Sequence, residues 1–373
     1  MNMKTLVIGA DHFNTLNIVR ALGQENIEVD VIIIGESKHS FVSKSKYISR
    51  YKIVNKLSTD LLVEHFSIKE VRIPVIATTD AAAVFLDQNY NLLSEYFILP
   101  SVKFKEGELI REMDKSKQLI HAKESGFIIP TSKALNLDTN FSNKLSDVNF
   151  PCIIKPEESY KGSKNDFRIC YSREDLMNKL NGLKGILSNV LVQQFIPNDE
   201  VILVAGVRTN KGKHYLYGEI NKLKNGKKHN NLGLLCFGEL STSTKLHNAC
   251  IDYLDRIDYH GLYSIEVLRP NFGVSSSNND YFLEINLRTD SLIFLYTKAG
   301  INYPAIWVKS CYGVEPSVNP SRRNIYGMNV IYYIKNTMGK DFISDLLKTD
   351  VFSLCNSKDI KPILYRFINH IFK

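Results

Sequence analysis

The sequence predicts an N-terminal α/β fold with a parallel sheet, followed by a region of α+β type. In the first hundred residues, short apolar runs alternate with segments of helical periodicity, which is typical of a parallel sheet covered on both faces. From about Lys105, strands follow one another with polar connections and few helices, which favours α+β. We therefore divide the 373 residues into an α/β domain at 1–104, a second domain at 105–315 and a C-terminal helical segment at 316–373.

The N-terminal region alternates expected strands with expected helices. The loop at 9–14, after the first strand, lacks the Gly-x-Gly-x-x-Gly pattern of a dinucleotide site, so this domain shows no NAD or FAD fingerprint. The strands are expected at 6–8, 29–34, 51–54, 75–77 and 96–99, and the helices at 15–23, 60–69 and 81–89.

The second region is expected to begin with a helix over 107–126, which Gly126 closes. A Ser/Asn-rich stretch at 271–280 is typical of a hairpin connection, and 221–232 of a basic loop. The strands are expected at 151–155, 167–171, 190–195, 201–207, 215–220, 262–268 and 281–288.

Composition excludes several classes of protein. With 44% hydrophobic and 23% charged residues of mixed sign, the chain is not intrinsically disordered. The net charge of +8 lacks the concentrated basic block of a dedicated nucleic-acid binder. The six cysteines form no Cys-x-x-Cys pair, which indicates reduced thiols rather than disulfides or a zinc site. Apolar stretches too short for a bilayer and a strand-like start without a signal peptide predict a cytoplasmic protein.

The most informative segment is the expected strand at 281–288. Because strand side chains alternate between faces, one set should point into the core and the other set should share the opposite face. The core set is Leu283, Ile285 and Leu287, and the polar set is Glu284, Asn286 and Arg288.

A second acidic residue, Glu266, lies on the preceding strand, and the connection between the two strands makes antiparallel pairing plausible. Two carboxylates and an amide oxygen form a hard-oxygen site of the kind that Mg2+ prefers. Arg288 beside them would stabilise negative charge on a transferring phosphoryl group. An exposed polar sheet face with a cross-strand ion pair is the alternative, and alternation alone does not separate the two.

Five segments resemble, in order along the chain, the signature segments of the ATP-grasp superfamily. Each match is weak by itself, but five in order over roughly 180 residues are strong together. The third segment has only Gly162 where many relatives have several glycines. The segments are Asp114-Lys115 with Glu124-Ser-Gly126 and Ile129-Pro130, then Phe150–Pro156, Tyr160–Lys164, Val192–Pro197 with Asp199-Glu200, and Glu266 with Glu284-x-Asn286-x-Arg288.

This resemblance implies a pre-ATP-grasp α/β domain followed by an ATP-grasp nucleotide-binding fold. It also implies ATP and Mg2+, or Mn2+ in its place, as cofactors, with metal ligands Glu266, Glu284 and Asn286 and catalytic residues Arg288 and Lys155. The implied nucleotide-binding residues are Lys115, Lys155, Gly162, Ser163, Gln193, Gln194, Ile196 and Glu200.

Each of these roles has a simpler alternative. Lys155 lies in an apolar strand, and the ordered motifs favour a phosphate partner over a lysine that reaches to water. The alternative for Lys115 is a solvated helix residue, for Gly162 and Ser163 an ordinary turn, and for Glu200 a surface acid.

The function that the resemblance implies is a ligase that activates a carboxylate as an acylphosphate and joins it to an amine. Three segments, 94–100, 194–199 and 283–288, are similar to the bacterial D-aspartate ligase type, which uses an amine of a cell-wall precursor. The partners that the resemblance implies are a small carboxylate, namely an amino acid, and an amine acceptor, with no nucleic acid. A nucleotide-binding regulatory or scaffolding protein without turnover is the competing class.

The last segment, 360–373, places apolar residues at helical spacing among Lys361, Arg366 and Lys373. Such a helix either docks its apolar stripe on the protein's own core or lies on an anionic membrane. The few charges of the segment favour docking on the core and leave a weak membrane contact as the second interpretation.

Overall fold

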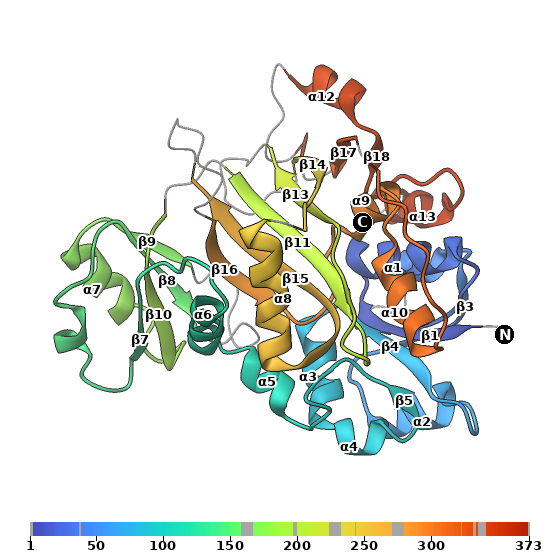
Figure 1. Cartoon of the computed structure of the whole chain (residues 1–373), viewed down its shortest axis with the longest axis horizontal. Helices are drawn as coiled ribbons and strands as arrows, with labels where there is room; N and C mark the ends of the chain where they lie inside the picture. The colour runs from blue at the N-terminus through green and yellow to red at the C-terminus, as the bar shows by residue number, and fades with distance from the viewer. Residues whose placement is uncertain are drawn as a thin grey trace.

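Three sheets organise the chain in its computed structural model (Figure 1). One parallel sheet belongs to the N-terminal region, a small antiparallel sheet forms a separate lobe, and a large mixed sheet lies between them. The structure describes residues 3–36, 39–157, 167–196, 200–223, 233–242, 244–270, 280–321, 323–330, 333–334 and 341–371.

The N-terminal sheet is parallel throughout, with the strand order β3-β2-β1-β4-β5, which confirms the predicted α/β class. Three of its helices, α1, α2 and α3, begin after residues whose side chains accept a backbone N–H: His12, Ser58 and Thr79. The strands are β1 (Lys4–Ala10), β2 (Glu28–Ile34), β3 (Ile48–Val54), β4 (Ile73–Ala77) and β5 (Phe97–Ile98), and the helices are α1 (Phe13–Gln24), the short η1 (Val42–Lys44), α2 (Thr59–Phe66), α3 (Asp80–Gln88) and α4 (Tyr90–Leu93).

The small lobe, green in Figure 1, is an antiparallel sheet with the order β7-β10-β8-β9. Its apolar side chains form their own core, in which Cys152, Cys170 and Leu176 are fully buried. The lobe consists of β7 (Ser132–Asn136), η2 (Ser142–Leu145), β8 (Cys152–Pro156), β9 (Arg168–Cys170), α7 (Arg173–Asn181) and β10 (Asn189–Gln194).

The large sheet has the order β16-β15-β11-β13-β14-β17-β18, and two short strands pair at its side. The single tryptophan, Trp307, is 1% exposed in the core that joins this sheet to α1. The elements are β6 (Ser101–Val102), β11 (Glu200–Arg208), β12 (His214–Tyr215), β13 (Gly218–Lys222), β14 (Leu234–Glu239), α8 (Lys245–Ile257), β15 (Tyr259–Arg269), β16 (Tyr281–Asn286), α9 (Ile293–Lys298), α10 (Tyr303–Cys311), β17 (Ile325–Met328) and β18 (Val351–Phe352).

Three expected elements differ from the prediction. The helix expected at 107–126 is two helices, α5 (Glu108–Glu112) and α6 (Lys115–Glu124), because the Asp114 carboxylate accepts the Lys117 N–H and starts a new helix. The strand expected at 215–220 is divided between β12 and β13. The C-terminal segment contains α12 (Phe342–Lys348) and α13 (Lys361–Ile371), but β17 and β18 also extend the large sheet there.

The cysteines and helices agree with two expectations from composition. All six cysteines are free thiols, although Cys355 is exposed rather than buried. Across the described ranges, no helix is both long and apolar enough to cross a bilayer.

Candidate active site

The candidate site begins on the polar face of two neighbouring strands, β15 and β16. They pair antiparallel, with Glu266 directly opposite Glu284 and Ser264 directly opposite Asn286. Directly opposed residues in an antiparallel pair point to the same face, with their Cβ atoms about 5 Å apart. The predicted juxtaposition of the two carboxylates is therefore present.

A β-bulge changes which residues of β16 face the core. The register shifts after Glu266, so that Val267 pairs with Phe282 and the ladder skips Leu283. The buried side chains are consequently Phe282, Ile285 and Leu287, at 0%, 4% and 3% exposure. The prediction that Leu283 is a core residue is wrong, because a bulge interrupts the alternation on which it rests.

Two of the predicted metal ligands have side chains without a protein partner. Within the part of the chain that the structure describes, the side chains of Glu284 and Asn286 make no hydrogen bond or ion pair, while Glu266 accepts one from Lys222 Nζ at 3.4 Å. A half-buried carboxylate without a partner is costly unless a cation meets it. The donor set of two carboxylates and an amide oxygen therefore fits Mg2+, whose remaining ligands are commonly phosphate oxygens and water. Among the described residues, no cluster of three or more His, Cys, Asp or Glu forms a metal site of another kind.

Lys155 on β8 brings a buried positive charge to these carboxylates. Its side chain is almost fully buried, and Nζ donates to Gln193 Oε1 at 2.6 Å. Burial lowers the pKa of Lys155 to about 8, although the charges of Glu284 and Glu266 oppose this and that of Lys115 adds to it. The charges of Glu284, Glu266 and Lys115, which come from the large sheet and α6, thus all influence Lys155 on the small sheet.

Gln193 on β10 orients that lysine. Its own side chain is 2% exposed, and its Nε2 donates to Ser132 Oγ at 3.0 Å. This second hydrogen bond leaves the amide oxygen directed at Lys155 Nζ. Gln193 therefore contacts Lys155 rather than serving only as a hinge residue.

Gly162 and Ser163 fall in 158–166, outside the described residues. The residues on either side of this segment both contact Lys115. Glu157 O accepts the Lys115 backbone N–H at 3.1 Å, and the Phe167 ring lies 5.8 Å from Lys115 Nζ and 6.0 Å from Lys155 Nζ. Glu157 therefore lies beside Lys115 and Phe167 beside both lysines, and Phe167 is a site residue that the sequence analysis missed.

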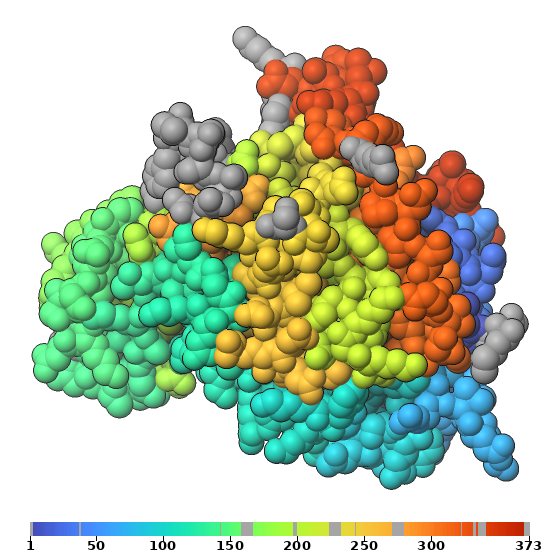
Figure 2. Space-filling model, in the orientation of Figure 1, coloured from blue at the N-terminus to red at the C-terminus, as the bar shows by residue number. Residues whose placement is uncertain are grey.

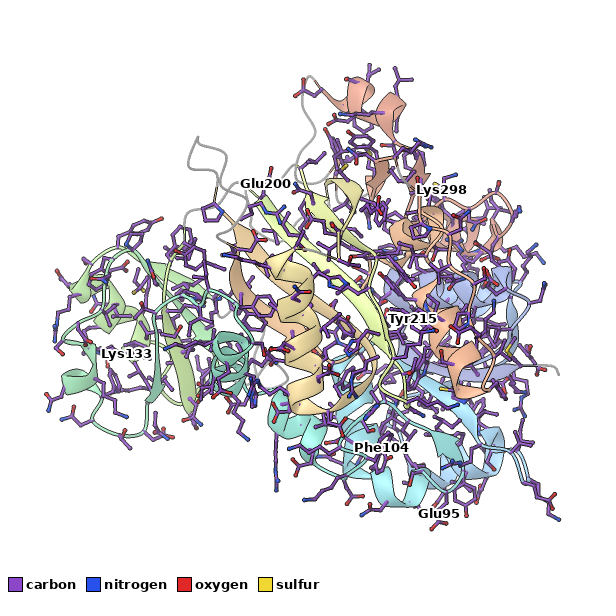
Figure 3. The ribbon with its side chains drawn as sticks, viewed as in Figure 1. Glu95, Phe104, Lys133, Glu200, Tyr215 and Lys298 are labelled. Atoms are coloured by element: carbon purple, nitrogen blue, oxygen red, sulfur yellow. The ribbon has the colours of Figure 1, made fainter. Side chains whose placement is uncertain are left out.

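In the predicted adenine hinge, one of the backbone groups that adenine would need is already hydrogen-bonded within the protein. The Gln194 backbone N–H donates to Thr131 O at 2.8 Å, so a role through this donor is excluded. Ile196 is 6% exposed, and its backbone makes no hydrogen bond with the other described residues. Glu200 starts β11 opposite Arg269 and is labelled at the upper end of that strand in Figure 3.

Arg288 is held by the N-terminal domain. Its Nε and Nη2 donate to the two oxygens of Asp80, at 2.5 and 3.2 Å, and its Nη1 donates to Thr289 O at 3.0 Å. Burial opposes the charge, but Asp80 raises the pKa of Arg288 above its ordinary value. Sequence analysis missed Asp80 because it is the first residue of α3, 208 positions before Arg288.

Asp290, two positions after Arg288, lies near enough to Glu266 for the two carboxylates to act on each other. Its Oδ1 accepts the Leu292 N–H at 2.6 Å, while its Oδ2 is buried and has no partner among the described residues. Burial raises the pKa of Asp290 to about 6, and the Glu266 carboxylate adds to this effect. A carboxylate in this state suits proton exchange near neutral pH.

No protein-family model and no curated protein sequence matches this chain. Solved structures do resemble it. An N5-carboxyaminoimidazole ribonucleotide synthetase in complex with ADP has a TM-score of 0.69 at 11% identity, over 88% of this chain and 82% of that chain. The L-amino acid ligase of Bacillus licheniformis has a TM-score of 0.63 at 14% identity, over 87% and 79% of the two chains. Biotin carboxylase of Campylobacter jejuni has a TM-score of 0.63 at 18% identity, over 86% and 73%.

Proposed function

The chain has the ATP-grasp fold, and from this premise we propose that it is an ATP- and Mg2+-dependent carboxylate–amine ligase. The observation that carries the proposal is the pair of strands β15 and β16. They direct Glu266, Glu284 and Asn286 to one face, and the buried cation of Lys155 acts on the two carboxylates. A carboxylate and a side-chain amide without a hydrogen bond among the described residues, Glu284 and Asn286, beside the buried Lys155 are suited to a ligand that carries both a metal ion and phosphates.

The reaction that fits this site has two steps. A carboxylate oxygen attacks the γ-phosphorus of ATP, the bond to ADP breaks, and an acylphosphate forms. The nitrogen of an amine then attacks the carbonyl carbon, phosphate leaves with its electron pair, and the nitrogen loses a proton. Because a carboxylate is a poor electrophile, the phosphorylation provides the leaving group that the second step needs.

The residues divide these tasks. Glu266, Glu284 and Asn286 would hold Mg2+, which neutralises charge on phosphate oxygens. Lys155, fixed by Gln193, and Lys115 would contact the phosphates as well. In this proposal Gly162 and Ser163 add backbone donors to the phosphates, Ile196 contacts adenine, and Glu200 accepts from the ribose.

Arg288 and Asp290 belong to the part of the site where the substrates would react. Arg288 is fixed by Asp80, so that its charge is in place before the acylphosphate develops. Asp290, with its pKa raised to about 6 and one oxygen without a partner, would accept the proton that the amine loses.

We propose an amino acid as the carboxylate substrate, in line with the L-amino acid ligase among the structural neighbours. For the acceptor we propose an amine of a cell-envelope precursor. This choice depends on the resemblance of 94–100, 194–199 and 283–288 to the D-aspartate ligase type.

The test is a screen for ADP release with ATP and Mg2+ over amino acids and simple carboxylates, with and without candidate amines. We expect release that depends on one carboxylate and is stimulated by an amine. A matched preparation of Glu284→Gln should release none above background. Tight ADP binding with no release for any substrate pair would instead support the nucleotide-binding class without turnover.

A further inference from the structure

Helix α13 leaves an apolar row on the surface. Ile360, just before the helix, and Leu364, Phe367 and Ile368 within it are 51%, 52%, 53% and 54% exposed. Their spacing of four, three and one residues places them within about 100° of one another around the helix axis. The row is therefore one continuous face rather than four scattered apolar residues.

The opposite side of α13 fixes the helix to the N-terminal domain. Ile363 is 8% exposed, and the Arg366 guanidinium lies over the rings of Phe13 and Phe41 at 4.4 and 4.8 Å. The Tyr365 hydroxyl pairs with His39 Nδ1 at 3.0 Å. Figure 2 shows the red C-terminal residues against the blue N-terminal ones at this edge of the molecule.

The turn before α13 is also bonded to the N-terminal domain, through the buried carboxylate of Asp359. Asp359 is 3% exposed and accepts from Arg20 Nε at 2.9 Å, Ser45 Oγ at 2.8 Å and the Lys46 N–H at 2.9 Å. Because the helix is held at this turn and along its inner side, the apolar row stays directed outward. The favoured expectation, that the apolar stripe docks on the core, is confirmed for Ile363 and is wrong for Leu364, Phe367 and Ile368. The side chain of Ile371, the last member of the stripe, lies outside the described residues.

Two segments that meet at α13, 38–52 and 351–373, are rich in Lys and Arg, although Asp11 and Asp30 bond to the first of them. Their sequences contain nine Lys and Arg, of which Lys38 and Lys373 lie outside the described residues, and one acid, the buried Asp359. Their excess of eight equals the net charge of the whole chain, so the remainder is neutral. Extending the first segment to 36–56 adds Glu36 and Lys56 and leaves the excess unchanged. Among these residues Lys46, Lys358 and Lys361 are exposed.

We propose that Ile360, Leu364, Phe367 and Ile368, with Lys46, Lys358 and Lys361, form a surface that docks on an anionic membrane. We call it the α13 surface. The apolar side chains would enter the boundary between headgroups and acyl chains, while the lysines meet the lipid phosphates. A second copy of the chain is a poorer occupant, because a symmetric contact would bring two positive surfaces together. The proposal concerns binding alone and does not rest on the proposed ligase activity.

A second exposed apolar helix provides a matched control. On α12, Ile343 and Leu347 are 69% and 83% exposed. The residues 333–350 around them contain three lysines and three aspartates, so this surface has no charge excess. If exposed apolar side chains alone caused membrane binding, α12 and α13 would contribute alike.

The experiment is co-sedimentation of the full chain with vesicles of phosphatidylglycerol and phosphatidylcholine, compared with phosphatidylcholine alone. At low ionic strength we expect the wild type to bind the anionic vesicles at least tenfold more tightly than the neutral ones. Salt at about 1 M, where the Debye length is about 3 Å, should abolish the difference. Leu364→Gln with Phe367→Gln, and separately Lys358→Glu with Lys361→Glu, should each weaken binding at least tenfold.

Leu347→Gln on α12 should bind as the wild type does, and all the variants should keep the wild-type melting temperature because the changed side chains are exposed. The proposal is overturned if the wild type stays in the supernatant, or if the Leu364→Gln/Phe367→Gln protein binds anionic vesicles normally. It is also overturned if the wild type is a dimer that this double variant makes monomeric while vesicle binding is absent. That result would make the α13 surface a contact between copies.

Discussion

Carboxylates that bond to the N-terminal domain and those of the β15–β16 face differ in what surrounds them. Asp11 accepts from the Ser40 hydroxyl and from the backbone N–H groups of Phe41 and Val42, and Asp359, from the C-terminal segment, is buried beside Arg20. Glu284, in contrast, has no hydrogen bond or ion pair for its side chain anywhere in the described ranges.

The difference teaches how to separate carboxylates that maintain the fold from those that are available to a ligand. A carboxylate whose oxygens are satisfied by the protein contributes to stability, and its removal leaves buried donors without acceptors. A half-buried carboxylate without a hydrogen-bonding partner does not stabilise the fold and is available to a cation or another ligand. Each of the following predictions tests this separation.

The largest effect should follow Glu284→Gln. Removing one charge from the face that would hold Mg2+ should lower ADP formation by about a thousandfold. The melting temperature without ligand should stay at the wild-type value, because the side chain has no partner to lose. Turnover assays and thermal unfolding of the same preparation measure both quantities.

The control for Glu284→Gln lies one position away. Ile285 is 4% exposed on the core side of β16, so Ile285→Ala should destabilise the protein by about 2–5 kcal/mol. Turnover per folded molecule should change far less than in Glu284→Gln. Equal activity losses in the two variants would contradict the division of the strand into a functional face and a core face.

The enclosed carboxylate should behave in the opposite way. Asp359→Ala leaves the Arg20 guanidinium, 4% exposed, without its ion pair, which should cost about 3–5 kcal/mol of unfolding free energy. Denaturant titration measures this loss, while ATP turnover of the folded fraction should stay within about twofold of wild type. An unchanged unfolding midpoint in Asp359→Ala would show that a buried, fully bonded carboxylate need not stabilise this fold.

Nucleotide affinity should depend on pH through Lys155. Its pKa of about 8 reflects burial, which the charges of Glu284 and Glu266 only partly offset, and bound phosphates should raise that pKa. Above pH 8 the free lysine loses its proton, so binding must take one up and ADP affinity should fall by about tenfold per pH unit. Below pH 8 the lysine is already charged and its contribution to the affinity is constant.

Calorimetry in two buffers of different ionisation heat measures this proton uptake. Lys155→Met should remove it, whereas Lys117→Met, an exposed lysine on the same helix as Lys115, should retain it. Proton uptake that persists in Lys155→Met would assign the effect to another group.

The smallest effect should come from Asp80→Asn. Asp80 contacts Arg288 and not the metal ligands, so it is a positioning residue. The variant should lower kcat by about tenfold, about 1.4 kcal/mol, and leave the KM for ATP unchanged. A rise in the KM for ATP with normal kcat would place Arg288 at the nucleotide instead of at the reacting carboxylate.

Sequence reasoning reached the parallel sheet and the pairing of Glu266 with Glu284, because both follow from local patterns of apolar and polar residues. It missed the bulge at Leu283, since a bulge depends on the partner strand as well as on the sequence of its own. It also missed Asp80, whose contact with Arg288 joins two domains. The outward direction of the α13 row was equally inaccessible, because periodicity identifies an apolar face but not what covers it.

The most direct test of the central claim follows the oxygen atoms of the carboxylate substrate that the ADP screen identifies. With both carboxylate oxygens labelled as oxygen-18, the acylphosphate route transfers one labelled oxygen to the released phosphate and keeps the other in the amide product. We predict labelled phosphate, measured by mass spectrometry, in the same amount as the amide. Unlabelled phosphate beside a labelled amide would contradict the account, because the carboxylate would then be activated by another route.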